Sequence, residues 1–142
     1  MQQVNQQELQ HLIAVSTGFI DTYVIECHDL PPMLLPQNIV LSALDSATDV
    51  KTVDWHDLQL PVHAVHHPQH TKGVALVIEG EDTQQRFALM CNEMPQTMRL
   101  RISEVVDAQQ QDLPEEVFEY VKVGEQIFHV PNLQTIEKKL GL

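Results

Sequence analysis

Positive charge is scarce in this chain. Lysine and arginine together number 8 against 20 aspartates and glutamates, so the formal net charge is −12. Such a field opposes binding to the phosphates of nucleic acid and to anionic membrane surfaces. The first basic side chain is Lys51, so the positive region of a secretory signal is missing and we expect a cytoplasmic protein. No apolar run approaches the roughly 20 residues of a spanning helix, so we expect no membrane insertion.

Cysteine is also rare, and common catalytic motifs are missing. Cys27 and Cys91 stand alone within apolar runs, which is typical of reduced, buried thiols rather than of a disulfide framework. His28 follows Cys27, but neighbouring residues of a strand point to opposite faces, so the imidazole is badly placed to activate the thiol. The sequence contains no G-x-S-x-G, P-loop, dinucleotide or H-E-x-x-H motif. We therefore expect no enzymatic activity, no catalytic residue and no cofactor.

Short β-prone segments are what the chain has in abundance. At 142 residues, with 43% hydrophobic and 20% charged residues, it has the composition of one soluble globular domain. Turn residues divide it into roughly nine short strands. This pattern predicts an all-β fold, mainly β with short terminal helices. It leaves open an immunoglobulin-like sandwich, an OB barrel, a cupin and paired SH3-like barrels.

The expected elements follow from local patterns. Residues 1–18 form an N-terminal helix or extension, in which Leu9, Leu12 and Ile13 share a face, and residues 19–142 form one domain. In the first half of the domain we expect a strand at 19–27, a turn at Asp29, Pro31 and Pro32, a strand pair within 33–44 interrupted at Pro36 and Asn38, and a loop at 45–51. In the second half we expect a hairpin from 73–79 and 85–91, one strand within 96–106, and a hairpin at 117–130 that turns at Gly124. The chain should close with a helix that is capped by Asn132, has Leu133, Ile136 and Leu140 on one face, and ends at Gly141.

The most specific segment is VDWHDLQLPVHAV, residues 53–65. It contains the only tryptophan, Trp55, ahead of an alternating run interrupted by Pro61. Proline donates no backbone hydrogen bond and is confined to strand edges, first positions or bulges, so its presence here needs a structural reason. An aromatic residue, two polar residues, Leu-x-Leu and Pro-Val resemble the signature strand of CheW-like chemotaxis adaptor domains. The order of segments 23–44, 74–106 and 120–140 is similar to that family too, so the resemblance covers about residues 19–142.

The resemblance implies a fold and a function. The fold is two SH3-like β-barrel subdomains that share a core, and the function is coupling receptors to a CheA-type histidine kinase without catalysis. The implied partners are the regulatory domain of that kinase and a methyl-accepting chemoreceptor. By match of position, the partner-binding groove between the barrels is lined by Ile39, Val40, Leu41, Trp55, His56, Asp57, Leu60 and Val62. Core packing is the competing interpretation, above all for Leu60 and Val62.

Two departures from the family pattern point to altered partner choice. His56 and Asp57 stand where the family usually has Arg-Gly, so an arginine fork is missing and Asp57 indicates a different turn. The connection at residues 45–53 is also shorter than in the family. Both departures lie on the half that resembles the receptor-contacting side. They favour a divergent adaptor of the type that serves type IV pilus twitching motility.

A histidine cluster supports the alternative function. His63, His66, His67 and His70 form the pattern H-x-x-H-H-x-x-H. The alternative is an unrelated small β-barrel that binds a metal or small ligand through this cluster. No acidic residue lies within it, however, and Pro68 disturbs the strand geometry that would bring imidazoles together. We therefore expect an exposed polar loop that binds transition metals only adventitiously.

Acidic residues gather between residues 102 and 121, where no lysine or arginine occurs. They are Glu104, Asp107, Asp112, Glu115, Glu116 and Glu119. One interpretation is a solvated loop that keeps the protein soluble. The other is a docking surface for a basic partner, which would speed association more than it would tighten binding and would weaken in salt.

Overall fold

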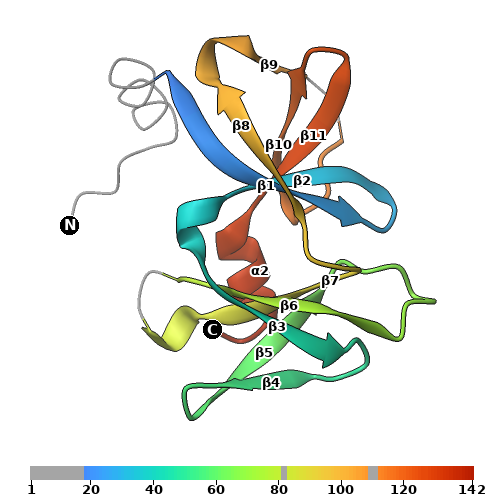
Figure 1. The fold of residues 1–142 in the computed structure, drawn as a ribbon, viewed down its shortest axis with the longest axis vertical. Coiled ribbons are helices and arrows are strands. Elements are labelled where there is room, and N and C mark those ends of the chain that lie inside the picture. Colours follow the sequence, from blue (N-terminus) through green and yellow to red (C-terminus); the bar gives the residue numbers. More distant parts are fainter. Residues whose placement is uncertain (1–17, 81–82, 109–111) are drawn as a thin grey trace.

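The computed structural model describes residues 18–80, 83–108 and 112–142, which form two β-sheets and one α-helix (Figure 1). The strands are β1 Phe19–Cys27, β2 Leu30–Pro36, β3 Val40–Ala47, β4 Thr52–Trp55, β5 Leu58–Ala64, β6 Lys72–Ile78, β7 Phe87–Cys91, β8 Gln96–Arg101, β9 Val105–Asp107, β10 Val117–Val123 and β11 Gln126–Pro131, and the helix α2 spans Leu133–Lys139. Three single turns of 3-10 helix join them: η1 Gln37–Ile39, η2 Thr83–Gln85 and η3 Ile102–Glu104. The all-β prediction is confirmed.

In each sheet, the two edge strands follow one another along the chain. The six-stranded sheet has the order β8-β1-β2-β11-β10-β9, and the five-stranded sheet has the order β3-β6-β7-β5-β4. Six flat strands would hold their outer edges about 24 Å apart, whereas Arg101 at the end of β8 and Val105 at the start of β9 are separated by at most about 14 Å of extended chain. The sheet must therefore curve to bring its edges together. β3 and β4, joined by residues 48–51, are likewise the edges of the other sheet.

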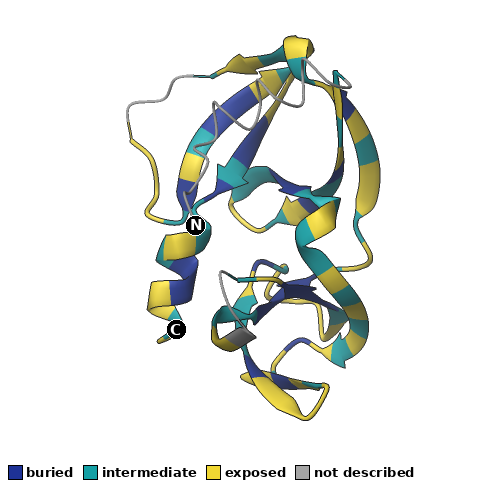
Figure 2. Cartoon of the chain, turned by 90° about the vertical axis from the view of Figure 1, so that its left-hand side faces the viewer, coloured by how far each residue is buried: buried dark blue, intermediate teal, exposed yellow. Residues whose placement is uncertain are grey.

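Alternation along the buried strands builds three apolar clusters. Leu76 and Leu89 belong to a shared cluster, whereas the adjacent Val77 and Ala88 belong to a cluster on the other face of the five-stranded sheet. The shared cluster joins both sheets and α2 and contains Ile25, Met33, Leu35, Val65, Leu76, Ile78, Phe87, Leu89, Cys91 and Ile136. The lower cluster contains Val53, Leu60, Ala75, Val77, Ala88 and Met90, and the upper cluster contains Leu34, Leu100, Val121 and Phe128. Figure 2 shows these buried stretches along the strands of both sheets.

The closing helix forms as its sequence predicts. The Asn132 side chain accepts a hydrogen bond from the backbone N–H of Thr135 at 3.2 Å, which caps the first turn. Ile136 is buried in the shared cluster, and Gly141 has a φ of +81°, the left-handed conformation that ends many helices. Within the described ranges no helix is both long and apolar enough to cross a membrane. The helix predicted around Leu9 lies outside the described residues.

Several strand predictions are also confirmed. The first strand is β1, and the strand pair interrupted near Pro36 is β2 and β3 with η1 between them. β6 and β7 pair antiparallel, as do β10 and β11, whose turn contains Gly124 with a φ of +62°. These segments were predictable because a strongly apolar alternating run is bounded on each side by a residue that favours a turn.

The turn predicted at Asp29 is confirmed, because the chain turns at His28 and Asp29, where Asp29 has a φ of +63°. Its predicted extension over Pro31 and Pro32 is wrong, because both prolines lie inside β2. The pairing of β2 with β1 shifts register between the pairs Ile25–Met33 and Cys27–Leu30. The prolines occupy this irregular stretch, where a missing backbone donor is tolerated.

Two further boundaries differ from the prediction. The loop predicted at residues 45–51 is half strand, because β3 continues to Ala47 and pairs with β6 as far as Lys72. β3 is an edge strand with alternating exposure, and the exposed residues at its end, Asp45 and Ala47, are polar or small, so this end does not resemble a buried strand. The single strand predicted within 96–106 is divided into β8, η3 and β9, because the chain leaves β1 and joins β10 on the other edge. The strands therefore number eleven in the described residues rather than nine.

Candidate functional site

The segment 53–65 is a hairpin rather than one strand. β4 and β5 pair antiparallel, with Trp55 opposite Leu58, and His56 and Asp57 form the two-residue turn between them. Both turn residues are left-handed, with φ values of +49° and +64°. This geometry matches the mirror-image turn that suits the twist of a hairpin, and histidine and aspartate enter it more readily than most side chains. The hairpin therefore has a tight turn without glycine.

Pro61 lies where β5 changes partners. Up to Pro61 the strand pairs with β4, and from Val62 to Ala64 it runs parallel to β7. The N–H of Val62 donates to the carbonyl of Lys51 at 3.1 Å, which closes the β4 side of the ladder. The missing donor of the proline thus falls at the boundary between two ladders, which explains how a strand tolerates it.

Trp55 stands between the core and the surface. Its side chain is half-buried and packs against the lower cluster. The ring of His56 lies 4.2 Å from the indole ring, tilted by 44°, and the guanidinium carbon of Arg86 lies 5.4 Å from the ring centroid. Trp55 therefore has an apolar side in the lower cluster and polar, cationic neighbours elsewhere.

The leucines of β5 have opposite roles. Leu60 is only 3% exposed and belongs to the lower cluster, so its interpretation as a core residue is the one that the burial supports. Val62 is half-buried against the same cluster. Leu58, the first residue of the Leu-x-Leu pattern, is 41% exposed at the end of the hairpin. Of these two leucines, it is thus Leu58 that exposes an apolar side chain on the hairpin.

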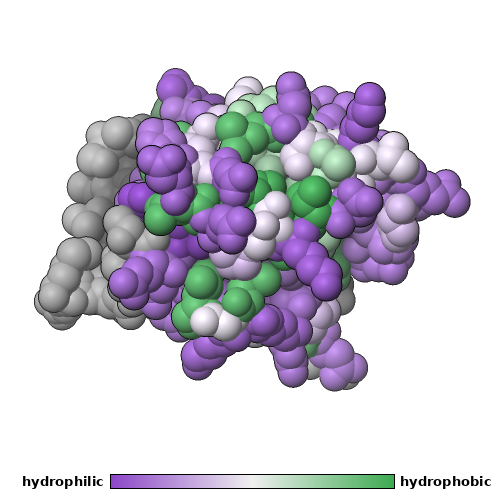
Figure 3. All heavy atoms as spheres, turned by 90° about the horizontal axis from the view of Figure 1, so that it is seen from below, coloured by the Kyte–Doolittle hydropathy of each residue, from purple (hydrophilic) through white to green (hydrophobic). Residues whose placement is uncertain are grey.

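Ile39, Val40 and Leu41 lie apart from the hairpin in the strand order. Ile39 and Val40 pack against the shared cluster, whereas Trp55 and Val62 pack against the lower one. Leu41 is 37% exposed on β3, and β3 and β4 are opposite edges of the sheet. Five of the eight predicted groove residues therefore divide between two clusters, and Leu41, His56 and Asp57 belong to neither. Figure 3 views the molecule from the side on which β4 lies in Figure 1 and shows apolar groups scattered among polar ones.

The predicted histidine cluster separates into two parts. His66, His67 and His70 lie on the loop after β5, where the His67 and His70 ring centroids are 6.2 Å apart. His63 is half-buried on β5, and burial lowers the pKa of its imidazole. In the described part of the chain, no group of three or more histidine, cysteine, aspartate or glutamate side chains is placed to hold a metal ion.

Other histidines join His63 around a pocket at the seam between the sheets. This seam pocket has a volume of about 230 Å³ and is lined by Cys27, His28, Leu30, Met33, His63, Ala64, Val65, His66, Glu116, His129 and Ile136. His129 is buried, and its Nδ1 donates to the carbonyl of Pro31 at 2.6 Å. Burial lowers its pKa, although that hydrogen bond opposes the shift. Sequence reasoning did not place His28 and His129 in one site, because one lies in the β1–β2 turn and the other in β11, and two histidines so distant in sequence give no pattern.

Both thiols are protonated at neutral pH. Burial raises the pKa of Cys27 to about 12 and raises the pKa of Cys91 as well. The Sγ atom of each cysteine donates to the carbonyl two residues earlier at 3.5 Å. Because the thiolate is the nucleophilic form, neither side chain is poised for covalent chemistry.

The acidic stretch is partly neutralised by the closing helix. Nζ of Lys139 lies 3.1 Å from Glu115 and 2.7 Å from Glu116, and the hydrogen bond to Lys139 lowers the pKa of Glu116. Glu104 lies 3.8 Å from Arg101. Three of the six acids thus have cationic neighbours within the chain, which favours the interpretation of this stretch as part of the fold's own surface over that of a docking surface.

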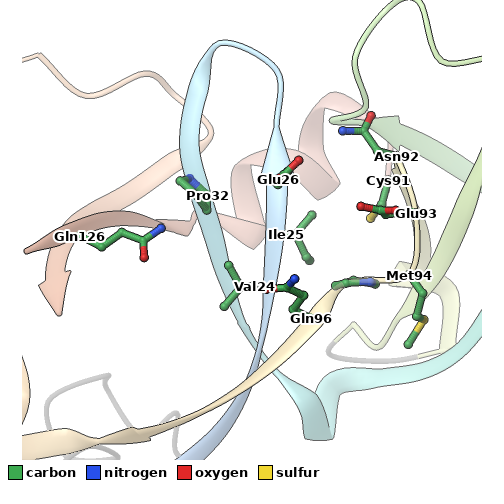
Figure 4. A pocket seen from close by; sticks show the side chains of 11 residues that line it. Val24, Ile25, Glu26, Pro32, Cys91, Asn92, Glu93, Met94, Gln96 and Gln126 are labelled. Carbon is green, nitrogen blue, oxygen red and sulfur yellow. The ribbon is translucent and has the colours of Figure 1, made fainter. Parts of the chain in front are cut away.

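A second pocket, of about 140 Å³, lies between the β1–β2 hairpin and the segment that joins β7 to β8 (Figure 4). Glu26 of β1 and Glu93 of the joining segment line it together with Asn92 and Gln96. The exposed Met94 lies at the same segment, with 49% of its surface accessible. The pocket therefore offers carboxylate and amide contacts beside apolar ones from Val24, Ile25 and Pro32.

No family model matches this chain, and no curated protein does.

Proposed function

We propose that this protein is a non-catalytic chemosensory adaptor of the CheW-like type, which couples receptors to a CheA-type histidine kinase by binding both. The observation that carries the proposal is the pair of curved sheets around a common apolar cluster. Each sheet joins its own edges through a short connection, and each has a cluster of its own on the face away from the shared one. Two SH3-like barrels with a shared core would have this architecture, and we propose this fold for the protein.

The architecture suits bridging. The shared cluster takes residues from both sheets and from α2, so the two halves form a single packed unit. Close-packed protein interiors resist deformation, so partners bound to the two halves are held at a fixed separation. An adaptor needs no bond-forming chemistry, which agrees with two thiols that stay protonated at neutral pH.

We place one partner on the β4–β5 hairpin. Trp55 and Leu58 present apolar surface beside the polar turn of His56 and Asp57. An aromatic anchor with a polar rim is the usual composition of an interface centre. The kinase regulatory domain is the partner that we assign to this surface, and a methyl-accepting receptor is the second partner. Because His56 and Asp57 replace the family's Arg-Gly pair, we assign the protein to the twitching-motility type, acting in the cytoplasm.

The test is direct binding to the regulatory domain of the CheA-type kinase encoded in the same genome. Isothermal titration calorimetry should give saturable one-to-one binding by the wild-type protein. Leu58→Ser should weaken this binding, whereas Ile127→Ser should not. Ile127 is the matched control because it is 37% exposed and lies on β11 of the other sheet. Absence of binding by the wild-type protein to this domain and to the receptor's cytoplasmic tip would overturn the proposal.

The alternative is a small β-barrel that binds a metal or small ligand through His63, His66, His67 and His70. What favours it is the seam pocket, which His63 and His66 line together with His28 and His129. Zinc or nickel added at increasing concentration should raise the thermal midpoint if such a site exists, because a ligand that binds only the folded state stabilises it. An unchanged midpoint would oppose the metal-binding form of the alternative.

A further inference from the structure

Arg86 carries a positive charge in an acidic protein and has no carboxylate partner among the residues that the structure describes. It lies between η2 and β7, with its guanidinium carbon 5.4 Å from the centroid of the Trp55 ring. Its Nε atom is buried and has no hydrogen-bond partner in the residues that the structure describes, and the same is true of Oε1 of the preceding Gln85. Buried polar atoms without partners are costly, so this corner has one donor and one acceptor whose hydrogen-bonding requirement is unsatisfied among the described residues.

The other arginines show how easily this chain pairs its cations. Arg99 donates to Asp21 at 2.9 Å, and Arg101 lies 3.8 Å from Glu104. Each of them also lies over the ring of Phe19, at 5.7 and 5.1 Å. The sequence has three arginines and 20 acids. Arg86 is therefore the arginine that keeps the aromatic contact but, among the described residues, has no acid.

The fold fixes the position of this guanidinium. Phe87 and Ala88, the next residues, are fully buried in two different clusters, so the backbone at Arg86 is anchored. On the other side, a Cβ at Gly80 would lie 2.5 Å from the Cβ of Gln85, so only glycine allows the chain to pack so closely there. The Trp55 ring then orients the planar group. A cation held in this way loses little freedom on binding.

We infer that Arg86, whose guanidinium lies over the ring of Trp55, binds a carboxylate side chain of the protein partner that docks on the β4–β5 hairpin. The inference rests on the proposed function and names the charge of the partner surface: acidic, next to an apolar patch that covers Leu58. A guanidinium binds a carboxylate through two parallel hydrogen bonds. A net charge of −12 disfavours a polyanion at this position, so a single carboxylate is the ligand of choice.

The sole tryptophan makes a selective test possible. Full-length protein labelled with 5-fluorotryptophan carries one ¹⁹F signal, from Trp55, so an unlabelled partner stays silent. The probes are the regulatory domain of the CheA-type kinase and the cytoplasmic tip of a methyl-accepting receptor, both from the same genome. Titration with the kinase regulatory domain, the partner assigned to this hairpin, should shift the signal. Arg86→Gln should weaken the binding of that probe about tenfold and flatten its dependence on salt, and Arg86→Lys should restore only part of the affinity.

Arg99→Gln is the matched control, because it removes the same charge and the same kind of aromatic contact on the other sheet. It should leave binding unchanged. Circular dichroism and the thermal midpoint of each variant separate loss of binding from loss of folding. Equal affinity of wild-type protein and folded Arg86→Gln would overturn the inference and leave the adaptor function intact, whereas a wild-type protein that binds neither probe would overturn both. A partner Asp→Lys or Glu→Lys substitution that restores binding to Arg86→Glu would identify the carboxylate.

Discussion

Two leucines of β5 provide the sharpest test of how this hairpin is built. Leu58 and Leu60 point to the same face of the strand, but Leu60 is 3% exposed and Leu58 is 41% exposed. Leu60→Ala removes a buried side chain from the lower cluster and leaves a cavity, so it should lower the free energy of unfolding by about 2–5 kcal/mol. For a domain of this size that corresponds to a fall in the thermal midpoint of roughly 6–15 °C.

Leu58→Ala should change the free energy of unfolding by no more than about 0.5–1 kcal/mol, because its side chain is already largely hydrated. Both variants are measured by urea unfolding, monitored through Trp55 fluorescence and far-ultraviolet circular dichroism. The wild-type slope against denaturant provides the check that the unfolding remains two-state. If Leu60→Ala loses less than 1 kcal/mol, or if the two variants lose the same amount, the assignment of Leu60 to the core and of Leu58 to the surface is refuted.

Three further predictions follow from the turn, the buried imidazole and the thiols. Because burial holds the folded-state pKa of His129 below the ordinary 6.5, its contribution to stability is present above that pH and is lost as the pH falls below it. The thermal midpoint of the wild-type protein should therefore decrease as the pH is lowered from about 7 to about 5.5. The decrease should be smaller in His129→Gln, whose side chain still donates to the Pro31 carbonyl, and an equal dependence of the midpoint on pH in both proteins would contradict this. Asp57→Gly should raise the thermal midpoint by a few degrees, because glycine is unstrained at the φ of +64°, whereas Asp57→Val should lower it. A higher midpoint for Asp57→Val than for Asp57→Gly would contradict the left-handed turn. Cys27 and Cys91 should react with Ellman's reagent at pH 8 only after denaturation, and rapid labelling of native protein would show that these thiols are accessible and ionised.

The fold was predictable wherever a local pattern had a single meaning. The strand from Phe19, the hairpin at Gly124 and the helix capped by Asn132 each combine an apolar repeat with a residue that favours a turn or cap. Polar edge strands were not predictable in this way. Residues 45–47 look like a loop because one face of β3 is solvated, and they are strand because β6 offers backbone partners.

The exposed residues of the hairpin around Trp55 were not predictable from the sequence. The sequence indicated the segment around Trp55, but it could not distinguish Leu58 from Leu60, because both fit one alternating pattern. It also indicated that an arginine is missing at His56. The structure provides a guanidinium beside Trp55 from a different strand, because β7 lies next to β5 in the sheet and Arg86 immediately precedes it. Such a pairing depends on strand order, which a linear pattern does not contain.

The amino-acid sequence by itself determined the chemical limits of this protein: an acidic surface, two isolated thiols, a β-rich chain and a proline within its most specific segment. These follow from composition and from neighbours along the chain. Only the tertiary structure decided that Pro61 lies where β5 exchanges β4 for β7, that His63 lines a pocket with His129, and that Arg86 rests on Trp55. Each of these depends on contacts between residues distant in sequence, and such contacts exist only after the sheets have curved and packed.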